Sequence, residues 1–345
     1  MKGNCYPLFP EDGAGIMVDT RYFVGLDVGG TTMKAAVVDD SGTAFPSVSL
    51  PTEPERGAEA GLETMCVAIR QAIKAAGMSL DDITAIGVAT PGLMDIKLGL
   101  ILDPPNLKPW RNVAVPQYIQ AKFEKPVAFQ NDANAAAFGE FWVGAGKEVD
   151  SFVLFTLGTG IGGGIVIGNQ VLEGEHSHGG ELGHMRIALP TEGRLCGCGR
   201  RGCLEAYASA TGVLGRTREE TPAYRGPTVL RDLLRKKGEE LTAKDIFDAA
   251  ATGDPLASKL VDDTAYYLAL GACNAIAMVD PQMIAFGGGM IAAGPSFLQT
   301  IKDYVLRVGL DYPAGKVQIQ YAQLGSDAGF IGAAGCARTL MQARA

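Results

Sequence analysis

The sequence predicts an α/β protein of two similar lobes that face each other across a cleft. Its 345 residues suit two compact units. Residues 25–38, GLDVGGTTMKAAVV, and residues 156–167, TLGTGIGGGIVI, are both β-rich stretches that reverse at a Gly/Thr-rich turn. Each such hairpin opens a run of alternating strands and helices, which indicates a duplicated α/β unit. A cleft between two such units suits an enzyme with two substrates.

The order of the elements follows from local patterns. Residues 22–39 predict a hairpin, residues 57–77 a helix with apolar residues at helical spacing, and residues 83–90 a buried strand that ends at Pro91-Gly92. Further along we expect a strand, a polar turn and a helix at 126–144, and a second hairpin from 150. A mobile charged insertion is expected at 216–240, followed by helices at 242–281. A strand with a glycine turn at 283–291, a strand at 317–324 and a closing helix of small residues complete the chain.

Composition excludes several classes of protein. The chain is 47% hydrophobic and 20% charged, which is typical of a soluble globular protein, and its net charge of −8 argues against a broad nucleic-acid-binding surface. Residues 1–21 lack an apolar core long enough for a signal peptide, and no apolar run approaches the ~20 residues of a membrane span. We therefore expect a cytoplasmic protein with an irregular N-terminal extension at 1–21 and without a nucleic-acid or membrane partner.

A cluster of cysteines and histidines is the most conspicuous feature of the chain. Residues 196–203, CGCGRRGC, hold three cysteines, and His184 lies shortly before them. His184, Cys196, Cys198 and Cys203 make a Cys₃His set, which predicts a closed tetrahedral zinc site. A disulfide would leave one cysteine unpaired, and there is no C-x-x-C redox motif. A closed site has no open coordination position, so the predicted role is structural support rather than activation of a nucleophile.

The second hairpin also satisfies a dinucleotide-binding pattern, G-x-G-x-x-G, at Gly158, Gly160 and Gly163. That motif requires strand, glycine turn and then a helix, whose N-terminus holds the pyrophosphate. Here the β-branched residues IVI follow Gly164, so a strand is predicted instead. The hairpin can still offer backbone N–H groups to a phosphate. A nicotinamide-dependent oxidoreductase is therefore disfavoured.

The chain resembles the sugar kinases of the hexokinase–actin–Hsp70 superfamily. DVGGTTMK at 27–34 is similar to their first phosphate motif and LGTGIGGG at 157–164 to their second, while GELGH at 180–184, CGCG at 196–199 and CLEAY at 203–207 resemble the signature of the ROK family. This resemblance implies two actin-like (ribonuclease H-like) lobes. The smaller would hold residues 22–135 and a C-terminal helix at about 327–345, and the larger, residues 136–326, would hold the zinc-binding loop and the nucleotide site. Only 21 residues precede the first strand, too few for the helix-turn-helix domain of ROK repressors, which favours the kinase branch.

The resemblance also assigns roles to individual residues. Asp132 is the expected catalytic base, although a helix N-cap is the simpler explanation of an Asp or Asn at 131–132 and both roles are compatible. The expected sugar ligands are Asn106, Asn131, Asp132, Glu181, His184 and Glu205. The expected phosphate and nucleotide residues are Asp27, Gly29, Gly30, Thr31, Thr32, Lys34, Gly158, Thr159, Gly160, Gly162, Gly287, Gly288 and Gly289. Asp27 would hold Mg²⁺ through water, and Lys34 either balances phosphate charge or is a solvated strand residue.

The implied reaction is phosphorylation of the 6-hydroxyl of glucose by ATP with Mg²⁺, as in bacterial ROK glucokinases. N-Acetylmannosamine, N-acetylglucosamine, fructose and allose are alternative acceptors, and polyphosphate is an alternative donor. A sugar-sensing protein without catalysis is a further alternative, which the presence of both Asp27 and Asp132 disfavours. The resemblance also implies a homodimer or homotetramer.

Overall fold

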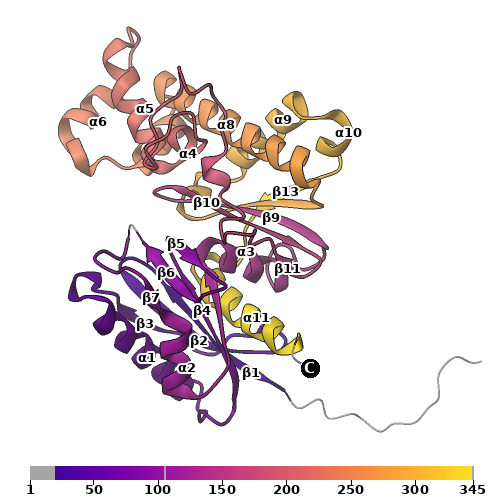
Figure 1. Ribbon diagram of the computed structural model, residues 1–345. Coiled ribbons are helices and arrows are strands. Elements are labelled where there is room, and N and C mark those ends of the chain that lie inside the picture. Colours follow the sequence, from indigo (N-terminus) through magenta and orange to yellow (C-terminus); the bar gives the residue numbers. More distant parts are fainter. Residues whose placement is uncertain (1–19, 105, 344–345) are drawn as a thin grey trace, which may run out of the picture.

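The computed structural model describes residues 20–104 and 106–343, so the predicted extension at 1–21 lies almost entirely outside the described residues. Within the described residues the strands form two five-stranded sheets and one three-stranded sheet (Figure 1). The first sheet contains β1 (Tyr22–Val28), β2 (Thr32–Asp39), β3 (Val48–Pro51), β4 (Ile83–Thr90) and β8 (Val127–Asn131). The second contains β9 (Ser151–Leu157), β10 (Ile161–Ile167), β11 (Gln170–Val171), β12 (Met283–Gly287) and β13 (Gln318–Tyr321). The small sheet contains β5 (Leu93–Asp95), β6 (Leu100–Asp103) and β7 (Val113–Ala114).

The two large sheets have the same topology. The strand order is β3-β2-β1-β4-β8 in the first sheet and β11-β10-β9-β12-β13 in the second. In each sheet the first three strands are antiparallel neighbours and the last three run parallel. The duplication predicted from the two hairpins is confirmed. Because β10 directly follows the glycine turn, the rejection of a dinucleotide-binding fingerprint is confirmed as well.

Helices cover both faces of the first sheet. The α-helices of both lobes, in chain order, are α1 (Ala58–Ala75), α2 (Val115–Phe123), α3 (Asp132–Trp142), α4 (Glu205–Ala208), α5 (Ala210–Ala223), α6 (Leu230–Lys237), α7 (Ala243–Ala251), α8 (Pro255–Val279), α9 (Pro295–Val308), α10 (Asp311–Ala314) and α11 (Ala328–Gln342). On the first sheet, α1 and α2 pack on one face and α11 on the other. Alternate residues of β1 point to opposite faces. Val24 and Leu26 pack in one cluster with residues of α1 and α2, whereas Phe23 packs in another with Phe330 of α11. Trp110 is buried beside α1, where it packs in the core of the first lobe.

The last helix of the chain completes the lobe with which the chain begins, as the colours of Figure 1 show. Its contact with the sheet is very close. A Cβ atom added at Gly25 or at Gly87 would lie 1.8 Å from a backbone oxygen of α11, so only glycine fits at these positions of β1 and β4. No described helix is long and apolar enough to cross a membrane.

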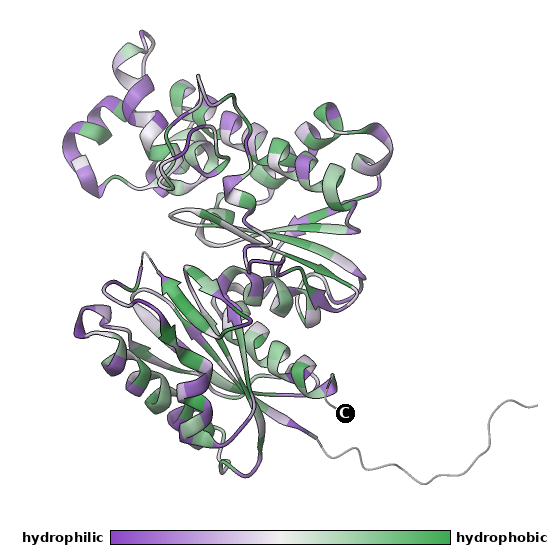
Figure 2. Cartoon of the chain, in the orientation of Figure 1, coloured by the Kyte–Doolittle hydropathy of each residue, from purple (hydrophilic) through white to green (hydrophobic). Residues whose placement is uncertain are grey.

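Two features differ from the sequence-based expectations. The segment 216–240, expected to be a mobile insertion, is mostly helical. It comprises the end of α5, then α6, and Arg216 and Leu230 within it are buried. Figure 2 shows why the sequence suggested otherwise, because α6 is predominantly hydrophilic whereas the strands of both large sheets are mostly hydrophobic. In addition, the lobe boundary predicted at 135/136 falls inside α3, which contacts strands of both large sheets.

Candidate active site

A cleft of about 600 Å³ lies between the two large sheets. It is lined by residues of both halves of the chain, including eleven of the predicted site residues. These are Asn106, Asn131, Asp132, Gly158, Gly160, Gly162, Glu181, His184, Cys198, Glu205 and Gly288. Residues spread over more than 180 positions of sequence thus meet at one site.

Asn131 and Asp132 stand at the junction of β8 and α3. Asn131 ends the strand and is the N-cap of the helix, with its Oδ1 accepting hydrogen bonds from Ala133 N at 2.9 Å and Asn134 N at 3.2 Å. The capping role therefore belongs to Asn131, which leaves the Asp132 carboxylate facing the cleft. Burial, reinforced by the charge of Glu181, raises the pKa of Asp132 although the Ala133 N–H opposes the shift. A carboxylate with a raised pKa is a stronger proton acceptor once it is ionised.

Asp27 lies near Asp132 at the end of β1. Its pKa is raised to about 7, first by burial and then by the charge of Asp132, while Lys34 lowers it. Lys34 is the cross-strand partner of Asp27 in β2, and its Nζ lies 2.5 Å from Asp327 Oδ1 and 3.2 Å from Ser326 Oγ. Two neighbouring carboxylates that both resist ionisation form an electrostatic environment in which a divalent cation is favoured.

Glu205 connects the second hairpin to the cysteine cluster. Ile161 N, at the start of β10, donates to Glu205 Oε2 at 2.9 Å, and Cys196 Sγ lies 3.4 Å from Glu205 Oε1. A Cβ atom at Gly160 would lie 2.3 Å from Glu205 Oε2, so any larger residue here would displace the Glu205 carboxylate.

The four predicted zinc ligands come together as one group. The ligand atoms of His184, Cys196, Cys198 and Cys203 all lie within 4.8 Å of one another. Two sulfurs bound to one tetrahedral zinc at ~2.3 Å would be about 3.8 Å apart, and Cys198 Sγ lies 3.7 Å from Cys203 Sγ. Cys196 Sγ is 3.8 Å from His184 Nδ1, and the opposite ring nitrogen is 3.9 Å from Glu181 Oε2. The donor set and its spacing fit zinc, and the same imidazole reaches a predicted sugar ligand.

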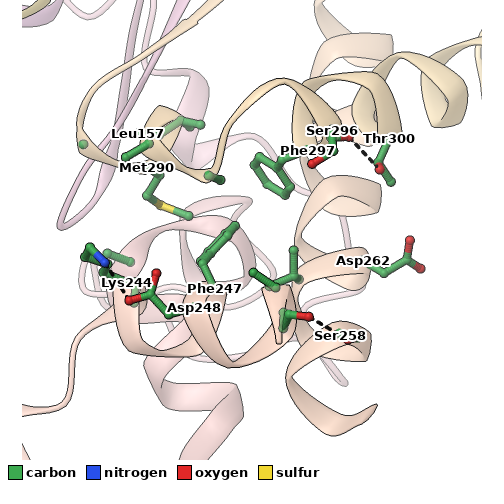
Figure 3. A pocket seen from close by; sticks show the side chains of 18 of the residues that line it. Leu157, Lys244, Phe247, Asp248, Ser258, Asp262, Met290, Ser296, Phe297 and Thr300 are labelled. Carbon is green, nitrogen blue, oxygen red and sulfur yellow. Dashed lines mark hydrogen bonds and ion pairs between the residues drawn. The ribbon is translucent and has the colours of Figure 1, made fainter. Parts of the chain in front are cut away.

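A second cavity, of about 680 Å³, opens on the other side of the second hairpin (Figure 3). Leu157 and Gly158 line both cavities, so the two meet at the hairpin turn. The rest of the second cavity is formed by Thr159, by Ala210 of α5, by residues of α7, α8 and α9 and by the short 3-10 helix Gly289–Ala293. Phe247 and Phe297 pack edge to face, with ring centres 5.1 Å apart, and Met290 lies near them. An apolar cavity with aromatic walls next to a glycine turn has the form of a nucleoside site.

Comparison with known proteins identifies the family. The ROK family profile matches residues 23–339. The chain belongs to the ROK family. It is 36% identical to the glucokinase of Halalkalibacterium halodurans, over 90% of this chain and 93% of that protein. Its fold is similar to the crystal structure of a ROK hexokinase from Thermus thermophilus, with a TM-score of 0.79 and 34% identity over 93% of this chain and 99% of that one. It is also similar to a ROK family glucokinase from Streptomyces griseus in complex with glucose and AMPPNP, with a TM-score of 0.74 and 33% identity over 92% of this chain and 99% of that one.

The predicted nucleotide residues of this ROK family chain fall into four groups. Gly158 lines both cavities, Gly160, Gly162 and Gly288 line the interlobe cleft, and Thr159 and Gly289 line the second cavity. Asp27, Gly29, Gly30, Thr31, Thr32 and Lys34 line neither cavity, and Gly287 lies buried at the end of β12. The first hairpin nevertheless borders the cleft, because a Cβ atom at Gly30 would lie 3.1 Å from Asn106.

Sequence reasoning missed several residues of the site. His178 is exposed and lines the cleft, although it belongs to no predicted ligand set. The residues of α7, α8 and α9 that line the second cavity were not predicted. The glycine turn at 287–289 is a sequence signal only for Met290 and Ala293 of the following 3-10 helix, which also line this cavity. Ala243, Phe247 and Phe297 carry no motif, since apolar residues at helical spacing predict a core.

Proposed function

We propose that the chain is an ATP-dependent glucokinase, which transfers the γ-phosphoryl group of ATP to the 6-hydroxyl of glucose. The observation that carries the proposal is that the interlobe cleft, with the Asp132 carboxylate in its lining, meets an apolar cavity at a glycine hairpin. That arrangement places an acceptor and a nucleotide on either side of one turn. The similarity to glucokinases over nine tenths of the chain supports glucose as the acceptor.

Asp132 is the proposed catalytic base. Its carboxylate stands in the cleft, where it can accept the proton of the sugar hydroxyl as the oxygen attacks phosphorus. Asp27, whose environment favours a cation, is proposed to orient the hydrated Mg²⁺ that accompanies ATP, and that ion would neutralise phosphate charge. The backbone N–H of Gly160 is proposed to approach the phosphates, because Gly160 lines the cleft whereas the Gly158 N–H already donates to Gly160 O at 3.0 Å.

Both lobes are proposed to bind the sugar. Asn106 and Asn131 approach the cleft from the first lobe, and Glu181, His184 and Glu205 approach from the second. Carboxylates and amides suit sugar hydroxyls, each of which can donate one hydrogen bond and accept others. Zinc at the Cys₃His set would fix His184 beside Glu181 and Cys203 two residues before Glu205, so its proposed role is to hold these sugar ligands in place.

A homo-oligomer is proposed on the basis of exposed apolar side chains on the second lobe. Met278 at the end of α8, Leu310 before α10 and Tyr312 within it are 77%, 63% and 78% exposed. Because α10 contacts both α8 and α9, these side chains lie on neighbouring elements, and such patches mark association surfaces.

The test of the function is a coupled assay with ATP, Mg²⁺ and a panel of hexoses, applied to the protein and to Asp132→Asn. Glucose is expected to give the highest kcat/KM, and Asp132→Asn is expected to lower kcat about 10²–10⁴-fold, the usual contribution of a general base. Asp303→Asn, which changes an exposed carboxylate on α9, is the matched control and should leave kcat unchanged. Tight glucose binding without turnover of any hexose would identify a sugar sensor and refute the proposal.

A further inference from the structure

Glu140 is a fully buried carboxylate at the junction of the two lobes. It lies in the last turn of α3, and its relative exposure is 0%. A buried carboxylate is tolerated only where hydrogen-bond donors surround it. The donors that surround Glu140 are backbone N–H groups. Ala145 N donates to Oε2 at 2.9 Å, Gln323 N to Oε1 at 2.9 Å, and Leu324 N to Oε1 at 2.6 Å.

These donors belong to the two segments by which the chain passes between the lobes. Residues 143–150 lead from α3 to β9 of the second sheet, and residues 322–327 return from β13 to α11 on the first sheet. The two segments are separated by more than 170 residues of sequence, yet one carboxylate binds both. A second link joins them, because Gln320 Nε2 donates to Ala145 O at 3.1 Å. Glu140 O also accepts from Gly144 N at 3.1 Å and Gly146 N at 2.8 Å.

The helices on either side of this junction form one body. A Cβ atom at Gly139 of α3 would lie 2.5 Å from Ala328 O, and a Cβ atom at Gly332 of α11 would lie 1.6 Å from Ala135 O. Contacts this close leave little room for the helices to slide. Glu140 and Asp132 stand at opposite ends of α3, eight residues or about 12 Å apart. A movement at the junction is therefore transmitted to the proposed base along a single helix.

We propose that Glu140 is the hinge residue of this kinase, and that it makes the two crossing segments bend together when the lobes close on the sugar. It is a positioning residue, because it touches neither cavity and acts through α3 on Asp132. The charge of the carboxylate is essential, since both of its oxygens accept N–H groups. The inference rests on the proposed function only where it concerns the closing ligand, glucose.

Glu140→Gln is the informative variant, because it preserves shape but leaves one accepting oxygen. The amide NH₂ then faces an N–H group, which displaces the side chain from its place between the two crossing segments and loosens both of them. Sugar binding needs both lobes, so the KM for glucose is expected to rise about tenfold and kcat to fall about tenfold as the closed state loses population. The second cavity is lined only by residues of the second lobe, so the Kd of ADP should change less than about twofold.

The matched control is Asp254→Asn. Asp254 is also a buried carboxylate that accepts backbone N–H groups, from Val229 at 2.7 Å and Ala257 at 2.9 Å, but all of its partners lie within the second lobe. A loss of stability alone should affect the two variants alike. Leu324→Pro provides a second route to the hinge, since it removes one N–H donor at a residue whose φ of −82° is close to that of proline. It should change the KM for glucose in the same direction as Glu140→Gln.

The experiment combines amide hydrogen exchange of the ligand-free proteins with steady-state kinetics. Exchange at 143–150 and at 322–327 should accelerate together in Glu140→Gln and stay unchanged in Asp254→Asn. A Glu140→Gln protein with the wild-type KM for glucose, or with exchange accelerated in only one crossing segment, would overturn the proposal. A wild-type protein that phosphorylates no glucose would refute the proposed function instead, and the exchange result would then decide the hinge by itself.

Discussion

Replacing Asp27 with Asn is expected to stabilise the first lobe at neutral pH while it weakens catalysis. Asp27 is buried beside Asp132, and these two causes raise its pKa from 3.8 to about 7. An acid whose pKa is higher in the folded protein than in the unfolded chain stabilises the fold fully only below the unfolded pKa. That stabilisation is lost as the pH rises toward the folded pKa. The cost of ionising Asp27 in the fold therefore grows between about pH 4 and pH 7 and is constant above that range.

The size of the effect follows from the shift of about 3 pKa units, which corresponds to about 4 kcal/mol at 1.36 kcal/mol per unit. At pH 5 most of the side chain is still protonated in the folded protein, and the cost is only about 2 kcal/mol. Asn has no proton to lose. The unfolding free energy of Asp27→Asn should therefore exceed that of the parent by about 2 kcal/mol more at pH 8 than at pH 5.

Urea unfolding at pH 5, 6, 7 and 8 in EDTA measures this difference without interference from Mg²⁺. The chain has two tryptophans, and in a Trp142→Phe background the buried Trp110 reports on the first lobe alone. The two lobes need separate reporters because a two-lobed protein need not unfold in one step. A stability difference that stays the same across the four pH values would refute the assignment of a raised pKa to Asp27. The kinase assay should show loss of kcat in the same variant.

Two further predictions concern the zinc ligands and the second cavity. Cys198→Ser should lose bound zinc, which elemental analysis measures. The KM for glucose should then rise sharply while the Kd of ADP stays the same. A zinc-free variant with an unchanged KM for glucose would contradict the supporting role of zinc. Phe247→Ala should raise the KM for ATP about tenfold, as expected for one lost aromatic contact, without changing the KM for glucose; equal changes in both would show that the cavity does not hold the nucleotide.

The sequence predicted those parts of the fold that depend on local patterns. The buried strand at 83–90 and the hairpin at 22–39 occur where periodicity and glycine turns placed them. The Cys₃His group could be predicted because its members are close in sequence and their chemistry suits one metal. The charged segment 216–240 was misinterpreted, because its polar surface hides the few side chains, such as Arg216, that pack inside.

Contacts between distant segments could not be predicted in this way. Lys34 pairs with Asp327, nearly 300 residues later, and nothing in either local sequence indicates the other. Ala243 and Phe247 line the second cavity, but apolar residues of a helix predict a core equally well. The hydrogen bonds of Glu140 are the contacts that a sequence is least able to predict. Its partners are backbone N–H groups, which every residue except proline carries, so no sequence pattern can reveal them.

The second cavity is formed by one lobe only, and this affects how readily ATP could be hydrolysed in the absence of sugar. The adenosine part of a nucleotide in this cavity would contact one lobe and bind the open and the closed forms equally well, so it cannot drive closure however tightly it binds. Glucose, which the proposed site holds from both lobes, is the ligand that can. While glucose is scarce, ATP would occupy an open site in which the base and the phosphate hairpins are apart. Wasteful hydrolysis of ATP by water is then suppressed by the architecture itself, without a separate inhibitor.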